Sequence, residues 1–262
     1  MGAESRFRKS NVQAHPYSHS DTSFCIVPVG SSSQPPHLKT KRPSAFLRGP
    51  LDEKMALPSL SPAHEQALRL IDEAHSEDPN KIDGPNGPET VPYELHYAQK
   101  MTRWLRSRCP EASPALQLAC RAQHFRRWEL PRSAFPMTRP GYLTWRAKQK
   151  SQAASLVSAL LSSPAIQPAL SAEERERVAA LVRKDGLSTD RETQVLEDVA
   201  CLVFLDDQLD DFEAKEEIDA DKMVGILRKT WGKMTDEGKK LALAMDLSER
   251  AKVLIAKALE AS

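Results

Sequence analysis

The sequence predicts an all-α protein, a single helical domain of about eight helices behind a non-globular N-terminal extension. Two serine-proline pairs, Ser61-Pro62 and Ser113-Pro114, are typical of a helix N-cap followed by a first-turn proline. Beyond residue 60, apolar residues recur at the spacing of one face of a helix. No stretch alternates between apolar and polar residues as a strand would, and no internal repeat is visible.

The composition is that of a globular protein without a strong overall charge. The chain has 262 residues, of which 40% are hydrophobic and 28% charged, and its formal net charge is +1. Attraction to a nucleic acid would therefore have to come from a local patch. No run approaches about 18 consecutive apolar residues, so we expect no membrane-spanning helix. The cysteines form no CxxC pair, which argues against a zinc site or a disulfide framework and favours a reducing, cytoplasmic location.

Residues 1–54 are predicted to be a disordered N-terminal extension, and residues 55–262 the helical domain. The extension holds nine serines and six prolines, with almost no periodic apolar pattern. Because it is poor in acids and rich in serine and basic residues, one alternative is a mitochondrial transit peptide, although its prolines interrupt an amphipathic helix. Another alternative is that Met55 is the true start of the protein.

The first helix is predicted to begin at the Ser61 cap. The segment 78–90 is rich in turn formers and predicts a loop. Thr90, with Pro92 close behind it, is expected to begin a second helix that continues to Arg108.

The rest of the chain is predicted to be helical as well. Ser113 is expected to cap a third helix that carries His124 and ends near Trp128, before an irregular basic connection. The later helices are expected at 142–161, from Ser171 to Gly186, at 190–213, around 223–234, and from the caps Thr235 and Ser248 onward.

Residues 121–146, which we call the basic-aromatic segment, form the least ordinary stretch of the chain. The segment holds six arginines against a single acid, Glu129, with aromatic rings between them and three prolines that prevent one continuous helix. Guanidinium groups bind phosphate and carboxylate through several donors and stack on aromatic rings, so the segment predicts an anion site. The alternative is a solvated basic loop whose aromatic rings are core anchors. The candidate phosphate ligands are Arg126, Arg127, Arg132 and Arg146, and the candidate stacking rings are Trp128 and Tyr142.

Three polar side chains, Glu94, His124 and Asp198, stand on otherwise apolar helical lines and are expected to point inward. Each has a structural explanation: a first-turn acid for Glu94, a carbonyl-bonded histidine for His124, and for Asp198 a buried salt bridge to an arginine that holds the basic loop in place. Together they predict one shared polar pocket with three catalytic candidates, in which His124 and Asp198 would bind a divalent metal as cofactor or act as general acid and base. The acidic run at 206–211 is expected to be a solvated helix end, with magnesium binding as the alternative.

Four sequence blocks resemble the signature of an uncharacterised family. They are ELHYAQKMTRWL, RAQHFRRWELPRSAFPMTRPGYLTWR, QVLEDVACLVFLDDQ and ILRKTWGKM. Through them the chain is similar, over residues 64–260, to the domain-of-unknown-function 4202 family of fungi, plants and bacteria, which has no established activity. Fungal members sometimes carry the label glutamyl-tRNA synthetase. This sequence has no Rossmann strand pattern and no HIGH-like or KMSKS-like motif, so that activity is not expected.

The helical arrangement of that family is similar to the HD-domain phosphohydrolases, which bind metal through a histidine, a His-Asp pair and a distant aspartate. The resemblance implies that His124 matches the histidine of the pair and Asp198 the distant aspartate. Phe125 stands where the paired aspartate should follow, and Glu94 or His96 would replace the first histidine. The resemblance thus implies a degenerate pocket, poor in metal or free of it.

We therefore expect a protein that binds a phosphorylated small molecule or a nucleotide, with HD-type hydrolysis as the candidate reaction. The first alternative is an RNA-binding module, for tRNA for example, that uses the same arginines and rings. The second alternative is an interaction scaffold. No membrane partner is expected, and the oligomeric state does not follow from the sequence.

Overall fold

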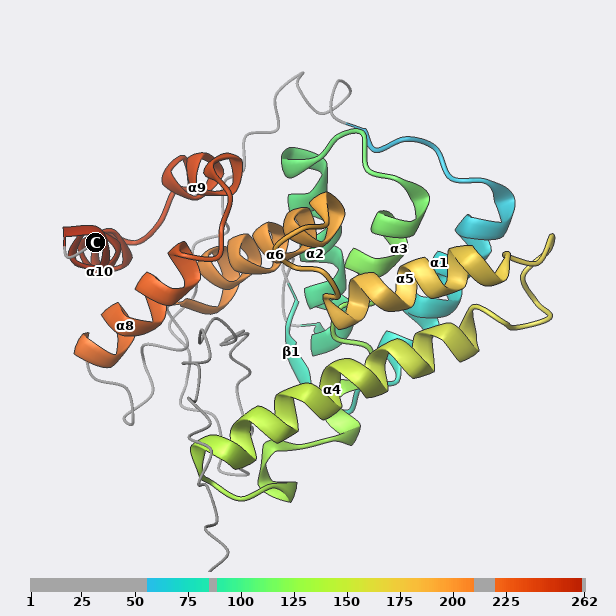
Figure 1. The fold of residues 1–262 in the computed structure, drawn as a ribbon, viewed down its shortest axis with the longest axis horizontal. Helices are drawn as coiled ribbons and strands as arrows, with labels where there is room; N and C mark the ends of the chain where they lie inside the picture. The colour runs from blue at the N-terminus through green and yellow to red at the C-terminus, as the bar shows by residue number, and fades with distance from the viewer. Residues whose placement is uncertain (1–55, 85–88, 210–219, 261–262) are drawn as a thin grey trace, which may run out of the picture.

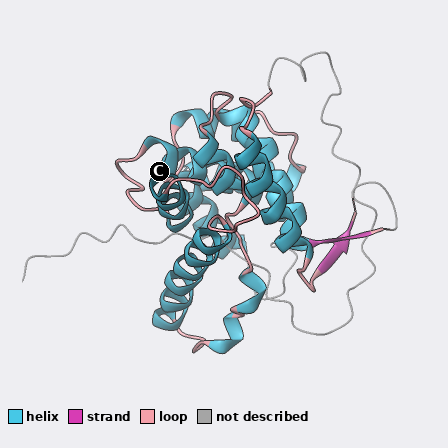
Figure 2. Ribbon diagram, turned by 90° about the vertical axis from the view of Figure 1, so that its right-hand side faces the viewer, coloured by secondary structure: helices cyan, strands magenta, loops and turns pink. Residues whose placement is uncertain are grey.

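The computed structural model describes residues 56–84, 89–209 and 220–260, which fold as a bundle of helices (Figures 1 and 2). Nine α-helices and one two-stranded antiparallel sheet make up this described part of the chain. The all-α prediction is therefore confirmed. The expected N-terminal extension lies outside the described residues. None of the helices that the structure describes is long and apolar enough to cross a membrane.

The elements follow one another through short connections. The helices are α1 (Pro62–Ser76), α2 (Tyr93–Arg108), α3 (Pro114–Arg121), α4 (Arg139–Leu160), α5 (Ala172–Arg183), α6 (Arg191–Val203), α8 (Ala220–Trp231), α9 (Asp236–Leu243) and α10 (Glu249–Glu260). The strands are β1 (Lys81–Asp83) and β2 (Thr90–Pro92), with Ile82 opposite Val91. Two 3-10 turns, Arg127–Glu129 and Arg132–Ala134, lie between α3 and α4, and a π-helical turn, Phe204–Gln208, follows α6.

The predicted helix caps are confirmed. Each cap hydroxyl accepts a hydrogen bond from a backbone N–H of the first turn, which would otherwise have no partner inside the helix. These caps are Ser61, Ser113, Ser171, Thr235 and Ser248. At Ser171 the bond is reciprocal, because the Glu174 side chain accepts from the Ser171 N–H and completes a capping box.

The second helix begins at Tyr93, later than predicted. Thr90 lies in β2, and Pro92 occupies the N-cap position. Strands of three residues are too short to show an alternating pattern, so the pairing between β1 and β2 was not predicted.

The third helix is shorter than predicted, because α3 ends at Arg121 and the chain turns before Trp128. Arg126 has a φ of 49°, a left-handed conformation that a right-handed helix cannot contain. His124 therefore lies in a turn instead of on a helix. This turn places its side chain differently from the helical position that the sequence predicted.

Helix α2 packs against four other helices of the described bundle. It contacts α1, α3, α6 and α9, while α4 packs along α5, and α8 along α10 (Figure 1). Fully buried side chains fill the space between these helices, including Met101, Leu105, Leu116, Leu118, Leu196 and Leu202. Each buried apolar side chain of this size stabilises the fold by about 1.5–3 kcal/mol.

Asp198, fully buried in α6, joins the ends of two other helices. Its carboxylate accepts from Nε of Arg108 at 2.7 Å, and from the N–H and hydroxyl of Thr235 at 2.8 Å and 2.5 Å. Arg108 is the last residue of α2, and Thr235 caps α9. Asp198 thus forms the buried salt bridge that its structural explanation required, although with Arg108 instead of an arginine of the basic-aromatic segment.

Gly238 in α9 is predicted to be intolerant of a side chain, because a Cβ there would lie 2.6 Å from Cγ of Asp198. We expect Gly238→Ala to lower the free energy of unfolding by about 1–3 kcal/mol through overpacking against a buried ion pair. Gly225→Ala in α8 is the matched control, since within the described part of the chain no atom lies within 4 Å of its Cβ position. That control should be neutral or stabilise by up to about 1 kcal/mol. Urea unfolding of both variants measures the difference, and equal effects would contradict the predicted close contact.

Candidate functional site

The basic-aromatic segment folds back onto the first half of α4. Two side chains of α4 hold the Leu130 carbonyl, because Nε1 of Trp145 donates to it at 2.8 Å and Nε2 of Gln149 at 3.3 Å. The guanidinium of Arg127 lies 5.5 Å from the centre of the Trp145 ring. Gly141 permits this close approach, since a Cβ there would lie 2.2 Å from the Pro136 carbonyl oxygen. Trp145 is thus a core anchor, as expected from the alternative in which the segment is a basic loop held by its aromatic rings.

Arg132 is buried and directed at the backbone of its own loop. It donates to the carbonyls of Phe135 and Pro136 at 3.0 Å and 2.7 Å. Its guanidinium also lies 6.0 Å from the Tyr142 ring. These contacts give Arg132 a loop-stabilising position, and they place a cation over the ring that was expected to stack on a ligand.

Arg126 is half-buried and held by acids. Its left-handed backbone directs the side chain to Glu129 at 2.6 Å and to Glu77 at 3.1 Å, and its guanidinium lies 5.7 Å from the Trp128 ring. These two carboxylates already occupy the donors that would bind a phosphate. Trp128, like Tyr142, already has a cation beside its ring.

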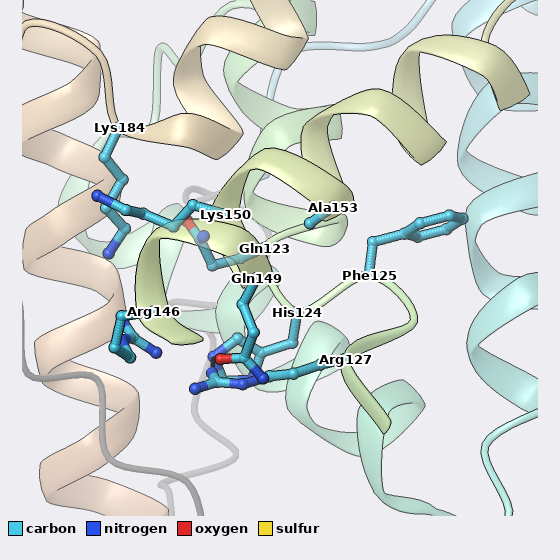
Figure 3. Close-up of a pocket in the computed structure, with 9 residues that line it drawn as sticks. All are labelled: Gln123, His124, Phe125, Arg127, Arg146, Gln149, Lys150, Ala153 and Lys184. Atoms are coloured by element: carbon cyan, nitrogen blue, oxygen red, sulfur yellow. Dashed lines mark hydrogen bonds between the residues drawn. The ribbon is translucent and has the colours of Figure 1, made fainter. Parts of the chain in front are cut away.

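A small pocket lies where the turn after α3 meets α4 and the end of α5 (Figure 3). Its lining residues are Gln123, His124, Phe125, Arg127, Arg146, Gln149, Lys150, Ala153 and Lys184. They include four cations and no acid. The pocket volume is about 20 Å³, which corresponds to roughly one or two water molecules. Of the predicted phosphate ligands, this pocket brings together Arg127 and Arg146.

Arg146 is the most unusual side chain of the pocket. Only 7% of it is exposed, and its Nε is buried without a hydrogen-bond partner. Among the residues that the structure describes, no carboxylate forms an ion pair with it. The neighbouring cation Lys184 differs, because it is paired with the buried carboxylate of Glu197.

Glu197 is fully buried beneath this region and is held by two lysines. Burial by itself would raise the pKa of the Glu197 carboxyl, but the ammonium groups of Lys184 and Lys233 outweigh that effect and lower the pKa to about 2. The Arg146 guanidinium also acts on Glu197, but more weakly than the two lysines. The single carboxylate is thus shared by several cations, and the pocket keeps an excess of positive charge.

His124 is buried, and its environment defines its protonation. Its ring stacks on Tyr97 at a centroid distance of 3.7 Å, and its Nε2 lies 2.6 Å from a terminal nitrogen of Arg127. A guanidinium only donates hydrogen bonds, so Nε2 must accept, and the neutral ring carries its proton on Nδ1. Burial, followed by the charges of Arg127 and Arg146, lowers the pKa of His124 well below its ordinary value of 6.5. His124 is therefore a neutral N–H donor, and no partner satisfies its buried Nδ1.

Glu94 is buried and holds the backbone of Arg127 in place. One carboxylate oxygen accepts the Arg127 N–H at 2.6 Å, and the other lies 3.2 Å from Nδ1 of His75. Nε2 of His75 lies 2.9 Å from the Arg121 carbonyl, so both nitrogens of His75 face oxygen acceptors. Burial raises the pKa of the Glu94 carboxyl, although the hydrogen bond from His75 acts in the opposite direction.

The sequence interpretation missed His75. Its signal was present, since His75 follows Ile71 by one turn on the apolar face of α1, where a buried histidine requires a partner. Gln123 and Gln149 were also missed, because uncharged amides give little indication of a binding site.

The predicted convergence of Asp198 with His124 is wrong. His124 lies on Tyr97 in the first turns of α2, whereas Asp198 binds Arg108 at the last residue of the same helix. These two positions on α2 are three turns apart, roughly 16 Å along the axis. The sequence pattern correctly predicted that both side chains point inward, but they point into different parts of the bundle.

A metal centre of the HD type does not fit the residues present. Among the described residues, no three histidine, cysteine or acidic side chains gather closely enough to hold a metal ion. Nε2 of His124 accepts from a cation and Nδ1 carries the proton, so neither ring nitrogen offers a lone pair to a metal. A general-base role for His124 meets the same obstacle.

The described part of the acidic run is not a solvated helix end. Asp206 accepts from Lys100 at 3.0 Å and from Nε1 of Trp104 at 3.1 Å, and Asp207 lies 3.1 Å from Nε2 of His96. The π-helical turn rotates these two acids toward α2, which a regular helical pattern did not predict. The last two acids of the run lie outside the described residues.

The fold and the pocket define a helical protein with a small, cation-rich site. The sequence signature described as "Domain of unknown function (DUF4202)" matches residues 65–255, and the chain belongs to this family. No curated protein and no solved structure matches the chain. The predicted family membership is confirmed, and the chemistry has to be argued from the pocket itself.

Replacing His124 is predicted to change how stability depends on pH. Because the folded pKa of His124 lies below 6.5, the unfolded chain takes up a proton there that the folded chain does not. The free energy of unfolding therefore falls as the pH is lowered below 6.5, by at most about 1.4 kcal/mol per pH unit from this residue. His124→Gln, which keeps an acceptor for Arg127, should lose less stability than the wild type between neutral pH and about pH 5. Urea unfolding across this range measures both, and parallel curves would contradict the predicted burial of a neutral ring.

Proposed function

We propose that this protein binds a small phosphorylated molecule, whose phosphoryl group enters the pocket beside Arg146. The observation that carries the proposal is the burial of the Arg146 guanidinium without a carboxylate partner among the described residues. An unpaired buried charge is costly, by several kcal/mol, and is retained only where something compensates it. An anionic ligand would supply that compensation.

The donors around the pocket suit an oxyanion. Arg146 offers a planar guanidinium, and Nδ1 of His124 offers a neutral N–H. Lys150, which is half-buried, adds a further positive charge to the lining. No side chain that lines the pocket is an acid, which leaves no repulsion against a phosphate.

The size of the pocket limits what enters it. A volume near 20 Å³ suits one small group after slight rearrangement of the rim, and not a nucleobase with its sugar. The rings expected to stack on a base, Trp128 and Tyr142, already lie beside Arg126 and Arg132. The geometry therefore supports recognition of the phosphoryl end of a small molecule better than recognition of a whole nucleotide.

The proposal concerns binding and does not include HD-type hydrolysis. The metal-assisted reaction expected from His124, Asp198 and Glu94 needs all three at one site, but Asp198 binds Arg108, whereas His124 and Glu94 are both bound by Arg127. The RNA-binding alternative is also less well supported, because it needs arginines that face outward, whereas Arg132 and Arg146 are buried.

Inorganic phosphate is predicted to stabilise the protein through Arg146. Phosphate at about one hundred times its dissociation constant should raise the free energy of unfolding by about 2.7 kcal/mol. Arg146→Met should lose most of this effect and remain at least as stable as the wild type without ligand, because it removes a buried unpaired charge. The same change at the exposed Arg139, also in α4, is the matched control and should keep the full response. Thermal and urea unfolding with and without phosphate measure all three proteins.

No stabilisation of the wild type by phosphate or by simple phosphate esters would overturn the proposed function. An equal response of Arg146→Met and the wild type would also overturn it. A stabilisation by RNA that greatly exceeds that by phosphate would favour the RNA-binding alternative.

A further inference from the structure

The pocket contains buried hydrogen-bond acceptors as well as donors. Gln123 and Gln149 line it, and each has only 8% of its surface exposed. The amide nitrogen of Gln149 donates to the Leu130 carbonyl at 3.3 Å, and that of Gln123 to the Val182 carbonyl at 3.5 Å. Because a carbonyl accepts only, these bonds fix the orientation of both amides and make the remaining Oε1 atoms acceptors.

Neither Oε1 atom has a hydrogen-bond partner, although both are buried. On the donor side, Nε of Arg146 and Nδ1 of His124 are buried without partners as well. Four buried polar atoms in one small pocket are unusual, since nearly all such atoms in folded proteins find a partner. What satisfies them must both accept and donate hydrogen bonds.

A fully deprotonated oxyanion such as sulfate has only acceptors. It would pair with Arg146 and His124 but would place oxygen lone pairs against the amide oxygens of Gln123 and Gln149. Hydrogen phosphate has the same shape and charge as sulfate but carries one O–H group. That O–H can be directed at an amide oxygen while the other oxygens accept from the guanidinium and the imidazole.

We infer that the pocket selects an oxyanion that carries its own hydrogen donor, as hydrogen phosphate does and sulfate does not, with Gln149 and Gln123 as the residues that determine this specificity. The inference rests on the proposed function, because it concerns the same pocket. The donor is either the O–H of the phosphate itself or a hydroxyl on the rest of a phosphorylated molecule. Both sources present the same chemistry to the amide oxygens.

The test compares anions of similar shape on the full-length protein near neutral pH and at equal ionic strength. Titration calorimetry and thermal unfolding with sodium phosphate and sodium sulfate should show phosphate binding roughly tenfold or more tightly, since sulfate leaves both amide oxygens unpaired and hydrogen phosphate pairs with one of them. Methyl phosphate, whose dianion has no donor, and glycerol phosphate, which has hydroxyls, separate the two sources. Tight binding of glycerol phosphate with weak binding of methyl phosphate indicates a substrate hydroxyl as the donor.

Leucine at the two glutamines tests which residues produce the preference. Gln149→Leu removes the acceptor and should weaken phosphate binding while sulfate binding is unchanged or improved, so that the preference falls roughly tenfold. Gln123→Leu should act in the same direction and serves as an independent variant if the first does not fold. Gln194→Leu is the matched control, because its amide also donates to a loop carbonyl, that of Leu187 at 2.8 Å, but lies outside the pocket.

The outcomes distinguish this inference from the proposed function. Equal binding of phosphate and sulfate to the wild type would overturn the inference and leave anion binding in place. A phosphate preference that survives in both leucine variants would also overturn it, since the donor would then be recognised elsewhere. The absence of binding by every anion would overturn both and would assign the four polar atoms to ordered water.

Discussion

The hydrogen bond from the Arg127 backbone to the buried carboxylate of Glu94 is the contact on which the rest of the site depends. At 2.6 Å it fixes the turn after α3 against α2, and His75 of α1 holds the other oxygen of the same carboxylate. With its backbone fixed, Arg127 reaches Nε2 of His124 and the face of Trp145. Three helices and one turn are thereby locked together, and the tautomer of His124 follows from that lock. Glu94, the acid expected to take part in catalysis, therefore positions the backbone of Arg127.

The charges of the bundle are separated along α2. The pocket beside its first turns is lined by four cations and no acid, and the buried carboxylate of Glu197 close to it is already shared between Lys184 and Lys233. At its last residue, Arg108 and Asp198 neutralise one another. If Asp198 lay near His124, as the sequence suggested, it would pair with Arg146 and remove the attraction for an anion. The distance between the two networks therefore preserves the positive charge of the pocket.

Local signals predicted most of the fold, whereas the spatial relations of the site lay beyond them. The helices were predicted from the caps at Ser113 and Ser171 and from the apolar periodicity, because these signals depend only on residues close in the sequence. The same periodicity correctly predicted that Asp198 is buried. It does not show at which point along α2 the helix α6 packs, so the partner Arg108 was not predicted. The third helix ends at Arg121 and the chain becomes left-handed at Arg126, and no glycine or proline in the sequence announces either change. Arg146 was named among the anion ligands because the surrounding sequence is rich in arginines and aromatic rings. Its lack of a carboxylate partner among the described residues depends on packing, which the sequence does not reveal.

The buried state of Arg146 is difficult to explain by stability. An apolar side chain of similar length, such as methionine, would fill the same position in α4 without the desolvation of a charge, and buried ionic groups replaced in this way often leave a protein equally or more stable. Arg132 has a structural reason to be an arginine. Its guanidinium donates to two backbone carbonyls and lies beside two aromatic rings. Arg146 has no comparable reason among the residues that the structure describes. Since the two arginines lie in the same segment and differ in this one respect, the difference itself argues that Arg146 is retained for what enters the pocket from outside.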